Sequence, residues 1–264
     1  MTEHGQAKAM PTLVIQSHTD PLPFNWLKRC TDSVRQWSDT HAFSYRWLGD
    51  ELFSYVDEDL LKKAAPPSVI ATDLARLKVI QNALEDYERV LWFDADFLIF
   101  SPENFVLPNR HSSPMGYLLG REVWVQQQDE YPEKLKAFVK VHNAFLLCDR
   151  SNSFLDFYIE HAEQLVNKYQ GSMPPQFIGP KLLTALHNVL QCPVQETAGM
   201  LCPLVIRDIL SDGKSNAALT LMRKRSKESL AGANLCSSLV NKEGFNEAQM
   251  AALIDRLLKL GACL

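Results

Sequence analysis

A short apolar stretch that carries two carboxylates constrains the fold of this chain more than any other feature of its sequence. Between residues 90 and 100, every side chain except those of Asp94 and Asp96 is apolar. Residues 89–93 (RVLWF) are apolar enough and short enough to form a buried central strand of a parallel sheet. Because residues i and i+2 of a straight strand face the same side, both carboxylates can converge at its carboxyl end, where open α/β sheets bind ligands.

The two carboxylates need a compensating partner in so apolar a segment. Burying an unpaired carboxylate is costly, and two close together repel, so the pair requires a cation, strong hydrogen bonds or the edge of a cleft. Mg²⁺ or Mn²⁺ prefers such hard oxygen ligands and leaves coordination positions for substrate phosphates. We therefore predict that Asp94 and Asp96 form a metal site for transfer from a nucleotide diphosphate. In the alternative, one Asp caps a turn and the other forms an ordinary salt bridge.

Strand and helix patterns alternate along the rest of the chain, which predicts an α/β fold. Apolar or alternating runs predict strands at residues 12–17, 42–48, 115–125 and 143–148. Helical spacing of apolar residues predicts helices at 24–37, 68–87, 153–169, 176–188, 215–225 and 246–260. Without an internal repeat or linker, we expect one domain over residues 1–264. Within it we expect a flexible N-terminus at 1–11 and a mostly helical C-terminal extension at 189–264, packed on the same domain.

Composition excludes several classes of protein. With 27 basic and 31 acidic side chains, the net charge is −4, which argues against binding to a nucleic acid. The most apolar run is too short to span a membrane and contains two aspartates, so we expect no transmembrane segment. The N-terminus lacks the apolar core of a secretory signal, and the cysteines form no C-x-x-C pair, so we expect a cytoplasmic protein with reduced thiols.

Three blocks of the sequence resemble the Asp-x-Asp glycosyltransferases of the GT-A fold, particularly retaining capsular-polysaccharide and mannosyl-transfer enzymes and glucosylating toxins, and more distantly glycogenin-like enzymes. The blocks are residues 72–100, 142–150 (HNAFLLCDR) and 177–184 (FIGPKLLT). The resemblance implies a Rossmann-like, nucleotide-sugar-binding mixed sheet flanked by helices. It also implies transfer of a sugar such as a hexose, dependent on Mn²⁺ or Mg²⁺ and retaining at the anomeric carbon. The donor would be a UDP- or GDP-sugar, and the acceptor a hydroxyl of a glycan, lipid or protein, for example in polysaccharide biosynthesis.

The resemblance assigns roles to the acidic motif and to the helix that precedes it. Asp96 would bind the metal directly, and Asp94 would act through the metal's water shell and through ribose or sugar hydroxyls. Asp73 and Arg76 lie three residues apart on one helix face, and in the family such a pair contacts the donor sugar and nucleotide. The alternative for this pair is a surface ion pair of little energetic value.

Five residues further along the chain are weaker candidates. Asn143 would hydrogen-bond a sugar, although an Asn that opens a strand can be only a turn residue. Gly179 and Pro180 could bring backbone amides of a helix start to the donor, or could simply begin a helix. The family often has a further ligand near the C-terminus, a His or an acid followed by a Ser and a Trp. Here Asn234 could bind the metal and Ser237 the donor, with a leucine in place of the aromatic residue.

Two other features allow more than one interpretation. The aromatic residues Trp47, Trp124 and Tyr131 could stack against an acceptor sugar or a base, or could belong to the core. The basic cluster at residues 223–227 could attract a pyrophosphate or an anionic membrane surface, which makes peripheral membrane contact an option, or could be a solvated helix face.

Two alternative functions remain open. Phosphotransferases of the haloacid-dehalogenase type also place Asp-x-Asp after an apolar strand, but near the chain start and followed by Thr, whereas Phe97 and Leu98 follow here. The second alternative is a catalytically silent module that binds a sugar or nucleotide. The intact acidic pair argues mildly against it.

Overall fold

The structure is a computed structural model that describes residues 11–65, 68–109, 115–171, 173–211, 213–240, 242–261 and 264, without the side chains of Ser68 and Leu239. The predicted flexible N-terminus, apart from Pro11, lies outside the described residues. No helix within the described ranges is long and apolar enough to cross a membrane.

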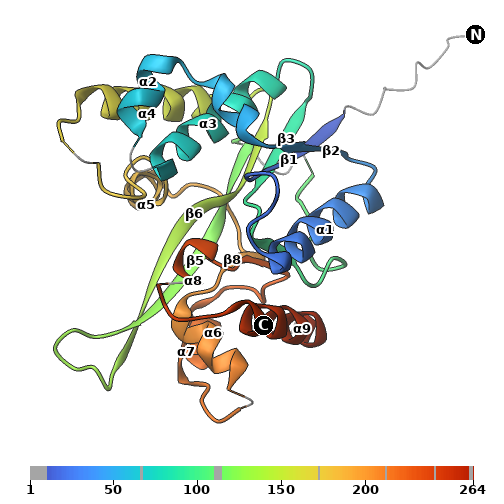
Figure 1. The fold of residues 1–264 in the computed structure, drawn as a ribbon, viewed down its shortest axis with the longest axis vertical. Helices are drawn as coiled ribbons and strands as arrows, with labels where there is room; N and C mark the ends of the chain where they lie inside the picture. Colours follow the sequence, from blue (N-terminus) through green and yellow to red (C-terminus); the bar gives the residue numbers. More distant parts are fainter. Residues whose placement is uncertain are drawn as a thin grey trace, which may run out of the picture.

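A mixed sheet forms the centre of the molecule (Figure 1). Its strands run in the order β2-β1-β3-β6-β5-β7. The strand bounds are β1 Thr12–Ser17, β2 Ser44–Leu48, β3 Arg89–Phe93, β5 Tyr117–Gln127, β6 Leu135–Asp149 and β7 Val194–Gln195. β1 pairs in parallel with β2 and β3, whereas β6 is antiparallel to both β3 and β5. This arrangement confirms the predicted α/β fold with a mixed sheet.

Helices cover both faces of the sheet. Their bounds are α1 Asn25–Thr40, α2 Glu58–Ala64, α3 Ser68–Ala83, α4 Phe154–Lys168, α5 Pro180–Leu190, α6 Pro203–Leu210, α7 Ala217–Arg225, α8 Ser237–Val240 and α9 Glu247–Leu260, with a 3₁₀ turn η1 at Asp50–Tyr55. Figure 1 shows α2, α3 and α4 together on one side and α1 and α9 on the other. In β1, Leu13 belongs to the apolar cluster that contains α3 and Val14 to the one that contains α1, so both faces are buried.

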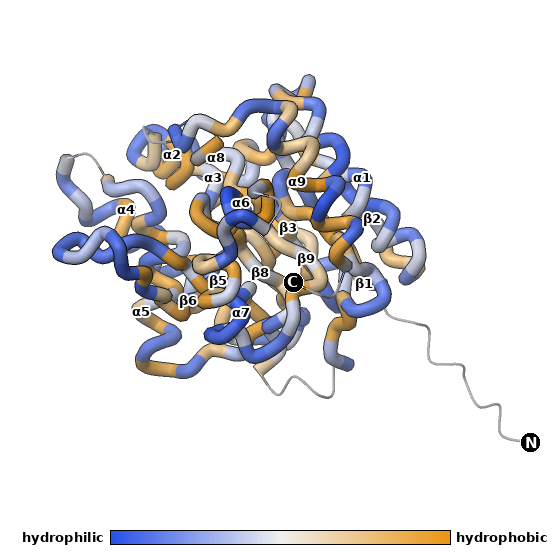
Figure 2. The backbone as a smooth tube through the Cα atoms, turned by 90° about the horizontal axis from the view of Figure 1, so that it is seen from below, coloured by the Kyte–Doolittle hydropathy of each residue, from blue (hydrophilic) through white to orange (hydrophobic). Residues whose placement is uncertain are grey.

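Apolar packing joins the C-terminal helices to the sheet. α6, α7 and α9 share one buried cluster with Trp26 of α1 and with Val123 and Val125 of β5. In Figure 2, apolar segments gather in the middle of the molecule and hydrophilic segments lie in the outer loops. The division into domains stays a prediction, because packing within one chain does not define it.

The C-terminal part also supplies strands, which its helical patterns did not predict. A second sheet has the order β4-β9-β8, with β4 at Phe97–Ile99, β9 at Gly232–Asn234 and β8 at Ala198–Met200. Strands of three residues are too short to show a period of two in the sequence. The antiparallel pairing of Phe97 with Asn234 brings the C-terminal segment next to the acidic motif.

The hairpin of β5 and β6 is longer than predicted and contains an irregularity. The pairing of the two strands shifts register between Leu119, which faces Leu146, and Gly120, which faces His142, so residues 143–145 have no partner on β5. Such a bulge redirects the side chains of the strand that contains it. Asn143 lies in this bulge.

Candidate active site

The acidic motif forms a turn at the carboxyl end of β3. The backbone N–H of Phe97 donates to the carbonyl oxygen of Asp94 (2.9 Å), and the N–H of Asp94 donates to Ala144 of β6 (2.9 Å). The chain bends at residues 94–97 rather than continuing straight, so the expected same-side geometry of a straight strand is not observed. Burial and the charge of Asp94, two residues away in the same turn, both raise the pKa of Asp96.

Asp94 is directed toward α3 and is partly exposed. Its Oδ1 accepts a hydrogen bond from Trp92 Nε1 (2.8 Å) and pairs with a guanidinium nitrogen of Arg76 (2.8 Å). Its Oδ2 accepts no hydrogen bond from the described residues, and 28% of the side chain is exposed. One oxygen is therefore fixed by the protein, and the other is free to take a ligand.

Arg76 connects Asp94 to a buried polar group on α3 and β6. Arg76 donates to the carbonyl oxygen of Asn143 (2.8 Å) and lies 3.4 Å from Oδ1 of Asp73. The same Oδ1 accepts a hydrogen bond from Asn143 Nδ2 (2.8 Å). Asp73 and Arg76 are 3% and 4% exposed. The interpretation of this pair as a surface ion pair is therefore wrong, since the helix face that carries it is buried against the sheet.

Two buried polar atoms of this group have no hydrogen-bond partner in the part of the chain that the structure describes. They are Asp73 Oδ2 and Arg76 Nε. Burial raises the pKa of Asp73 to about 6, although the charge of Arg76 and the hydrogen bond from Asn143 act in the opposite direction. Unsatisfied buried groups are rare and costly, so their presence here is typical of a site that binds a polar ligand.

Gly179 lies against this polar group because it has no side chain. A Cβ atom at this position would lie 2.3 Å from Asp73 Oδ2 and 3.1 Å from Asn143 Nδ2. Pro180 is the first residue of α5, as its sequence position predicted. The start of α5, at Gly179 and Pro180, therefore lies beside Asp73 and Asn143. Only the family resemblance predicts that these four residues share one site.

Asp96 is held by the C-terminal segment. Asn234 Nδ2 donates to its Oδ1 (2.5 Å), and the backbone N–H of Ser237 donates to its Oδ2 (2.7 Å). The oxygen of Asn234 accepts a hydrogen bond from the N–H of Cys236 (2.8 Å). Both predicted C-terminal residues therefore lie beside Asp96. The metal role of Asn234 and the donor role of Ser237 stay predictions.

The chemistry of the acidic pair fits a divalent cation. Within the described ranges, no group of three or more His, Cys, Asp or Glu side chains could hold a metal ion. A cation here would depend on the oxygens of Asp94 and Asp96, which are the hard ligands that Mg²⁺ and Mn²⁺ prefer. It would also offset the repulsion that raises the pKa of Asp96. Two protein ligands would leave coordination positions open for phosphate oxygens.

Two buried residues near the acidic turn, Gln16 and His142, are not among the site residues predicted from the sequence. Gln16 of β1 is fully buried, and its Nε2 donates to the carbonyl oxygen of Asp94 (3.1 Å). Its signal in the sequence is an amide that directly follows the apolar run at 13–15 (LVI) of this strand. His142 Nδ1 accepts from the N–H of Ala144 (3.1 Å), so its Nε2 donates to Ala198 O (3.2 Å). Burial lowers the pKa of His142 to about 4, so the ring is neutral at pH 7.

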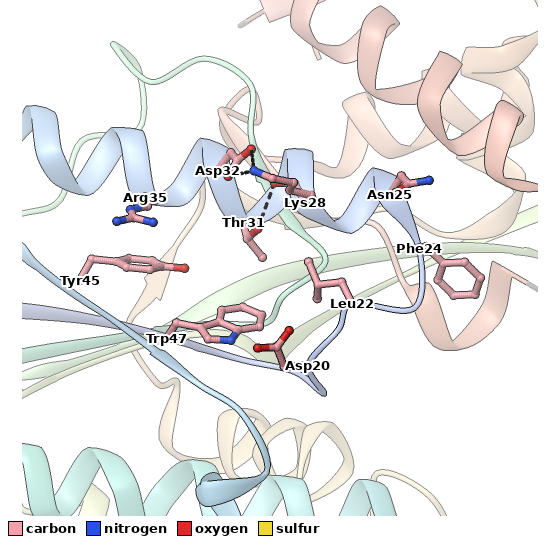
Figure 3. A pocket seen from close by; sticks show the side chains of 10 residues that line it. All are labelled: Asp20, Leu22, Phe24, Asn25, Lys28, Thr31, Asp32, Arg35, Tyr45 and Trp47. Carbon is pink, nitrogen blue, oxygen red and sulfur yellow. Dashed lines mark hydrogen bonds and ion pairs between the residues drawn. The ribbon is translucent and has the colours of Figure 1, made fainter.

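A cavity of about 330 Å³ lies between α1 and β2. It is lined by Asp20, Leu22, Phe24, Asn25, Lys28, Thr31, Asp32, Arg35, Tyr45 and Trp47 (Figure 3). The rings of Tyr45 and Trp47 lie on the β2 side, and the Arg35 guanidinium is 5.7 Å from the Tyr45 ring centroid. The Tyr45 hydroxyl donates to Gln16 Oε1 (3.0 Å), which links the cavity to the acidic turn.

Comparisons with known proteins give only distant similarities. No protein-family model and no curated protein matches the chain. A glycosyltransferase involved in glycosylation of the major capsid of PBCV-1 has 13% identity and a TM-score of 0.48, over 93% of this chain and 100% of that one. Mouse xyloside xylosyltransferase 1 has 10% identity and a TM-score of 0.47, over 86% and 98%. Core-mannan synthase A of Aspergillus fumigatus, in a Mn/GDP form, has 10% identity and a TM-score of 0.34, over 69% and 71%.

Proposed function

We propose that this chain is a glycosyltransferase that moves a sugar from a nucleotide-diphosphate sugar to a hydroxyl acceptor and depends on a divalent metal ion. The observation that carries the proposal is the contact of Arg76 with Asp94. This contact connects two neighbouring groups. The carboxylates of Asp94 and Asp96 suit a metal–diphosphate complex, and the buried group around Asp73 suits a sugar. Both halves of a nucleotide-sugar donor would therefore find partners at the carboxyl end of β3.

The metal–diphosphate end of the donor would lie against the acidic turn. Mn²⁺ or Mg²⁺, held by Asp94 and Asp96, would neutralise negative charge on the departing diphosphate. Asn234 and the Ser237 N–H fix the Asp96 carboxylate from the side of the C-terminal segment. Arg76 and Trp92 fix Oδ1 of Asp94 from the other side. Such fixed oxygens need little reorganisation when charge develops on the leaving group.

The sugar would lie beside α3 and the start of α5. Asp73 Oδ2 has no hydrogen-bond partner among the described residues, and a carboxylate oxygen can accept from a sugar hydroxyl. Asn143 and the backbone at Gly179 lie next to it, so an incoming hydroxyl would be positioned from more than one side. We propose retention at the anomeric carbon, as the family resemblance implies, without assigning a nucleophile.

The nucleoside would occupy the cavity between α1 and β2. Trp47 and Tyr45 offer aromatic faces for a base, and the charged side chains of α1 line the opposite wall. The cavity lies at the carboxyl ends of β1 and β2, next to the strand that ends at Asp94. UDP- and GDP-sugars are the donors that we propose to test first.

The two alternatives are less well supported. In a phosphotransferase that forms an aspartyl-phosphate, the attacking carboxylate must be free to approach phosphorus. Arg76 and Trp92 occupy only Oδ1 of Asp94 and leave Oδ2 available, so the argument against this alternative is the sequence after the motif, where Phe97 and Leu98 stand in place of Thr. A catalytically silent module would bind the same donor without turning it over, so it makes a distinct experimental prediction.

A thermal-shift screen tests the proposal. UDP-, GDP-, CMP- and dTDP-sugars would be added with and without Mn²⁺, because a ligand that binds only the native state raises the melting temperature. We expect a shift that requires both Mn²⁺ and one class of nucleotide, followed by slow donor hydrolysis with Mn²⁺. A shift without hydrolysis would support the silent module, and no shift with any donor would contradict the proposal.

A further inference from the structure

Residues at alternating positions of the β5–β6 hairpin form three cross-strand pairs on one side of the hairpin. Cross-strand pairs join Glu122 to Lys140, Trp124 to Phe138, and Gln126 to Lys136. We call these six residues the outer hairpin face, since side chains at every second position share one side of a sheet. The intervening residues Val123, Val125, Leu135 and Ala137 pack in the apolar cluster that contains α7, and Trp124 packs against the same cluster.

Two lysine ammonium groups on the outer hairpin face gather around one aromatic ring. Lys136 Nζ lies 4.8 Å and Lys140 Nζ lies 5.4 Å from the centroid of Phe138. Attraction between a cation and the π face holds each ammonium group near the ring. The two positive charges are thus kept close together, although they repel each other.

One buried carboxylate offsets only part of this charge. Glu122 Oε1 lies 3.8 Å from Lys140 Nζ, and Glu122 is 7% exposed, which raises the pKa of its carboxyl. Lys136 is exposed and forms no ion pair with a described residue. The centre of the outer hairpin face therefore carries net positive charge and free N–H donors. The acidic residues Asp129 and Glu130 lie at the turn and mark the far end of this face.

The outer hairpin face leads toward the acidic turn. Lys140 precedes Asn143, which contacts Asp73, by three positions on β6. A chain bound along the hairpin would therefore extend to the place where the proposed donor sugar lies.

We propose that the outer hairpin face binds the acceptor, and that this acceptor is an acidic glycan carrying carboxylate or sulfate groups. This inference rests on the proposed function for the role of acceptor, whereas binding itself does not require transfer. Lys136 and Lys140 donate charge-assisted hydrogen bonds to an anionic substituent. The half-buried Phe138 ring contacts the apolar face of a neighbouring sugar ring.

Affinity electrophoresis tests the proposal directly. The full-length protein would be run without donor or metal through native gels that contain hyaluronate, dextran sulfate or neutral dextran. We expect retardation by one or both acidic polymers and none by neutral dextran. The double variant Lys136→Gln/Lys140→Gln should bind the acidic polymer roughly tenfold more weakly, because two charge-assisted contacts are lost.

A matched variant controls for net charge. Lys62→Gln/Lys63→Gln removes the same charge from α2 and should be retarded like the wild type. Phe138→Leu keeps an apolar side chain but removes the ring that holds the two ammonium groups, and we expect it to weaken binding to a smaller degree.

Three results would overturn the proposal. They are equal retardation of the hairpin and α2 double variants, equal retardation by neutral dextran, and binding to vesicles of anionic phospholipid without binding to either acidic polymer. Donor hydrolysis by the wild type is measured separately with Mn²⁺. The acceptor proposal and the proposed function can therefore fail independently of each other.

Discussion

The carboxamide of Gln16 links the cavity beside α1 to the backbone of Asp94. Its Nε2 donates to the carbonyl oxygen of Asp94, and its Oε1 accepts a hydrogen bond from Tyr45. A carbonyl oxygen can only accept, so the Asp94 contact determines which way the amide faces. A ligand that displaces the Tyr45 hydroxyl would thereby act on the turn that holds the acidic pair.

Replacing Gln16 tests this link. Gln16→Met keeps the length of the side chain but removes one of the two hydrogen bonds to the Asp94 carbonyl oxygen, which then keeps only that from the Phe97 N–H, and this loss costs about 0.5–1.5 kcal/mol. We expect a lower melting temperature and a roughly tenfold weaker affinity for Mn²⁺, measured by electron paramagnetic resonance of the free ion. Tyr45→Phe should change the affinity in the same direction but less. An unchanged Mn²⁺ affinity in Gln16→Met would show that the amide has only a structural role.

The close approach at Gly179 makes a second prediction. In Gly179→Ala, the added methyl would collide with Asp73 Oδ2, and overpacking of this kind costs about 1–3 kcal/mol. We expect lower stability in denaturant melts and loss of the thermal shift with donor. Gly49→Ala is the control, because its methyl would meet only the carboxylate of the flexible Glu51 side chain. Normal donor binding by Gly179→Ala would place the sugar elsewhere.

Asp73 predicts a specific dependence of stability on pH. Burial raises its pKa to about 6 in the folded protein, above the ordinary aspartate value of 3.8. The folded state therefore binds the additional proton, and this contribution to stability is complete below about pH 4 and is lost as the pH rises through 6. We expect the unfolding free energy of Asp73→Asn, relative to the wild type, to rise between pH 4 and pH 6 and to stay flat above. A flat difference throughout would mean that Asp73 has an ordinary pKa.

Arg76 should matter for stability and for binding together. Arg76→Ala leaves the Asp73 carboxylate buried without its cation, and breaking a buried pair in this way costs about 3–5 kcal/mol. We expect a large fall in melting temperature together with a higher dissociation constant for the donor. Arg76→Lys retains the charge but not the planar fork that reaches Asp94 and Asn143, so it should recover stability only in part. Equal donor binding by wild type and Arg76→Lys would remove Arg76 from the donor site.

Much of the sheet could be predicted from the sequence, because its central strands are strongly apolar. β1 and β3 begin and end at the predicted residues. The first half of β6 lies outside the predicted strand at 143–148, because Lys136 and Lys140 interrupt its apolar residues without a regular alternation. The small strand β9 has no sequence signal of its own, and its position depends on pairing with β4.

The sequence predicts the two acidic residues of the site, but it does not predict which residues contact them. Asp94 and Asp96 stood out because the residues around them are apolar. The i and i+3 spacing of Asp73 and Arg76 is the same in a surface ion pair, so their burial could be learned only from the structure. Trp92 and Gln16 resembled ordinary strand residues, and their role follows from the turn that they hold in place.

Donor hydrolysis by the Asp94→Asn variant tests most directly whether the acidic turn supports metal-dependent sugar transfer. This variant retains an oxygen for Trp92 and Arg76 and replaces Oδ2, the oxygen without a hydrogen bond to the described residues, by an amide nitrogen. We predict that the wild type hydrolyses one class of nucleotide sugar only with Mn²⁺ or Mg²⁺. Asp94→Asn should be at least roughly 100-fold slower at a nearly unchanged melting temperature, whereas the surface variant Asp255→Asn should be normal. Normal turnover in Asp94→Asn, or wild-type hydrolysis that persists in a chelator, would contradict the account.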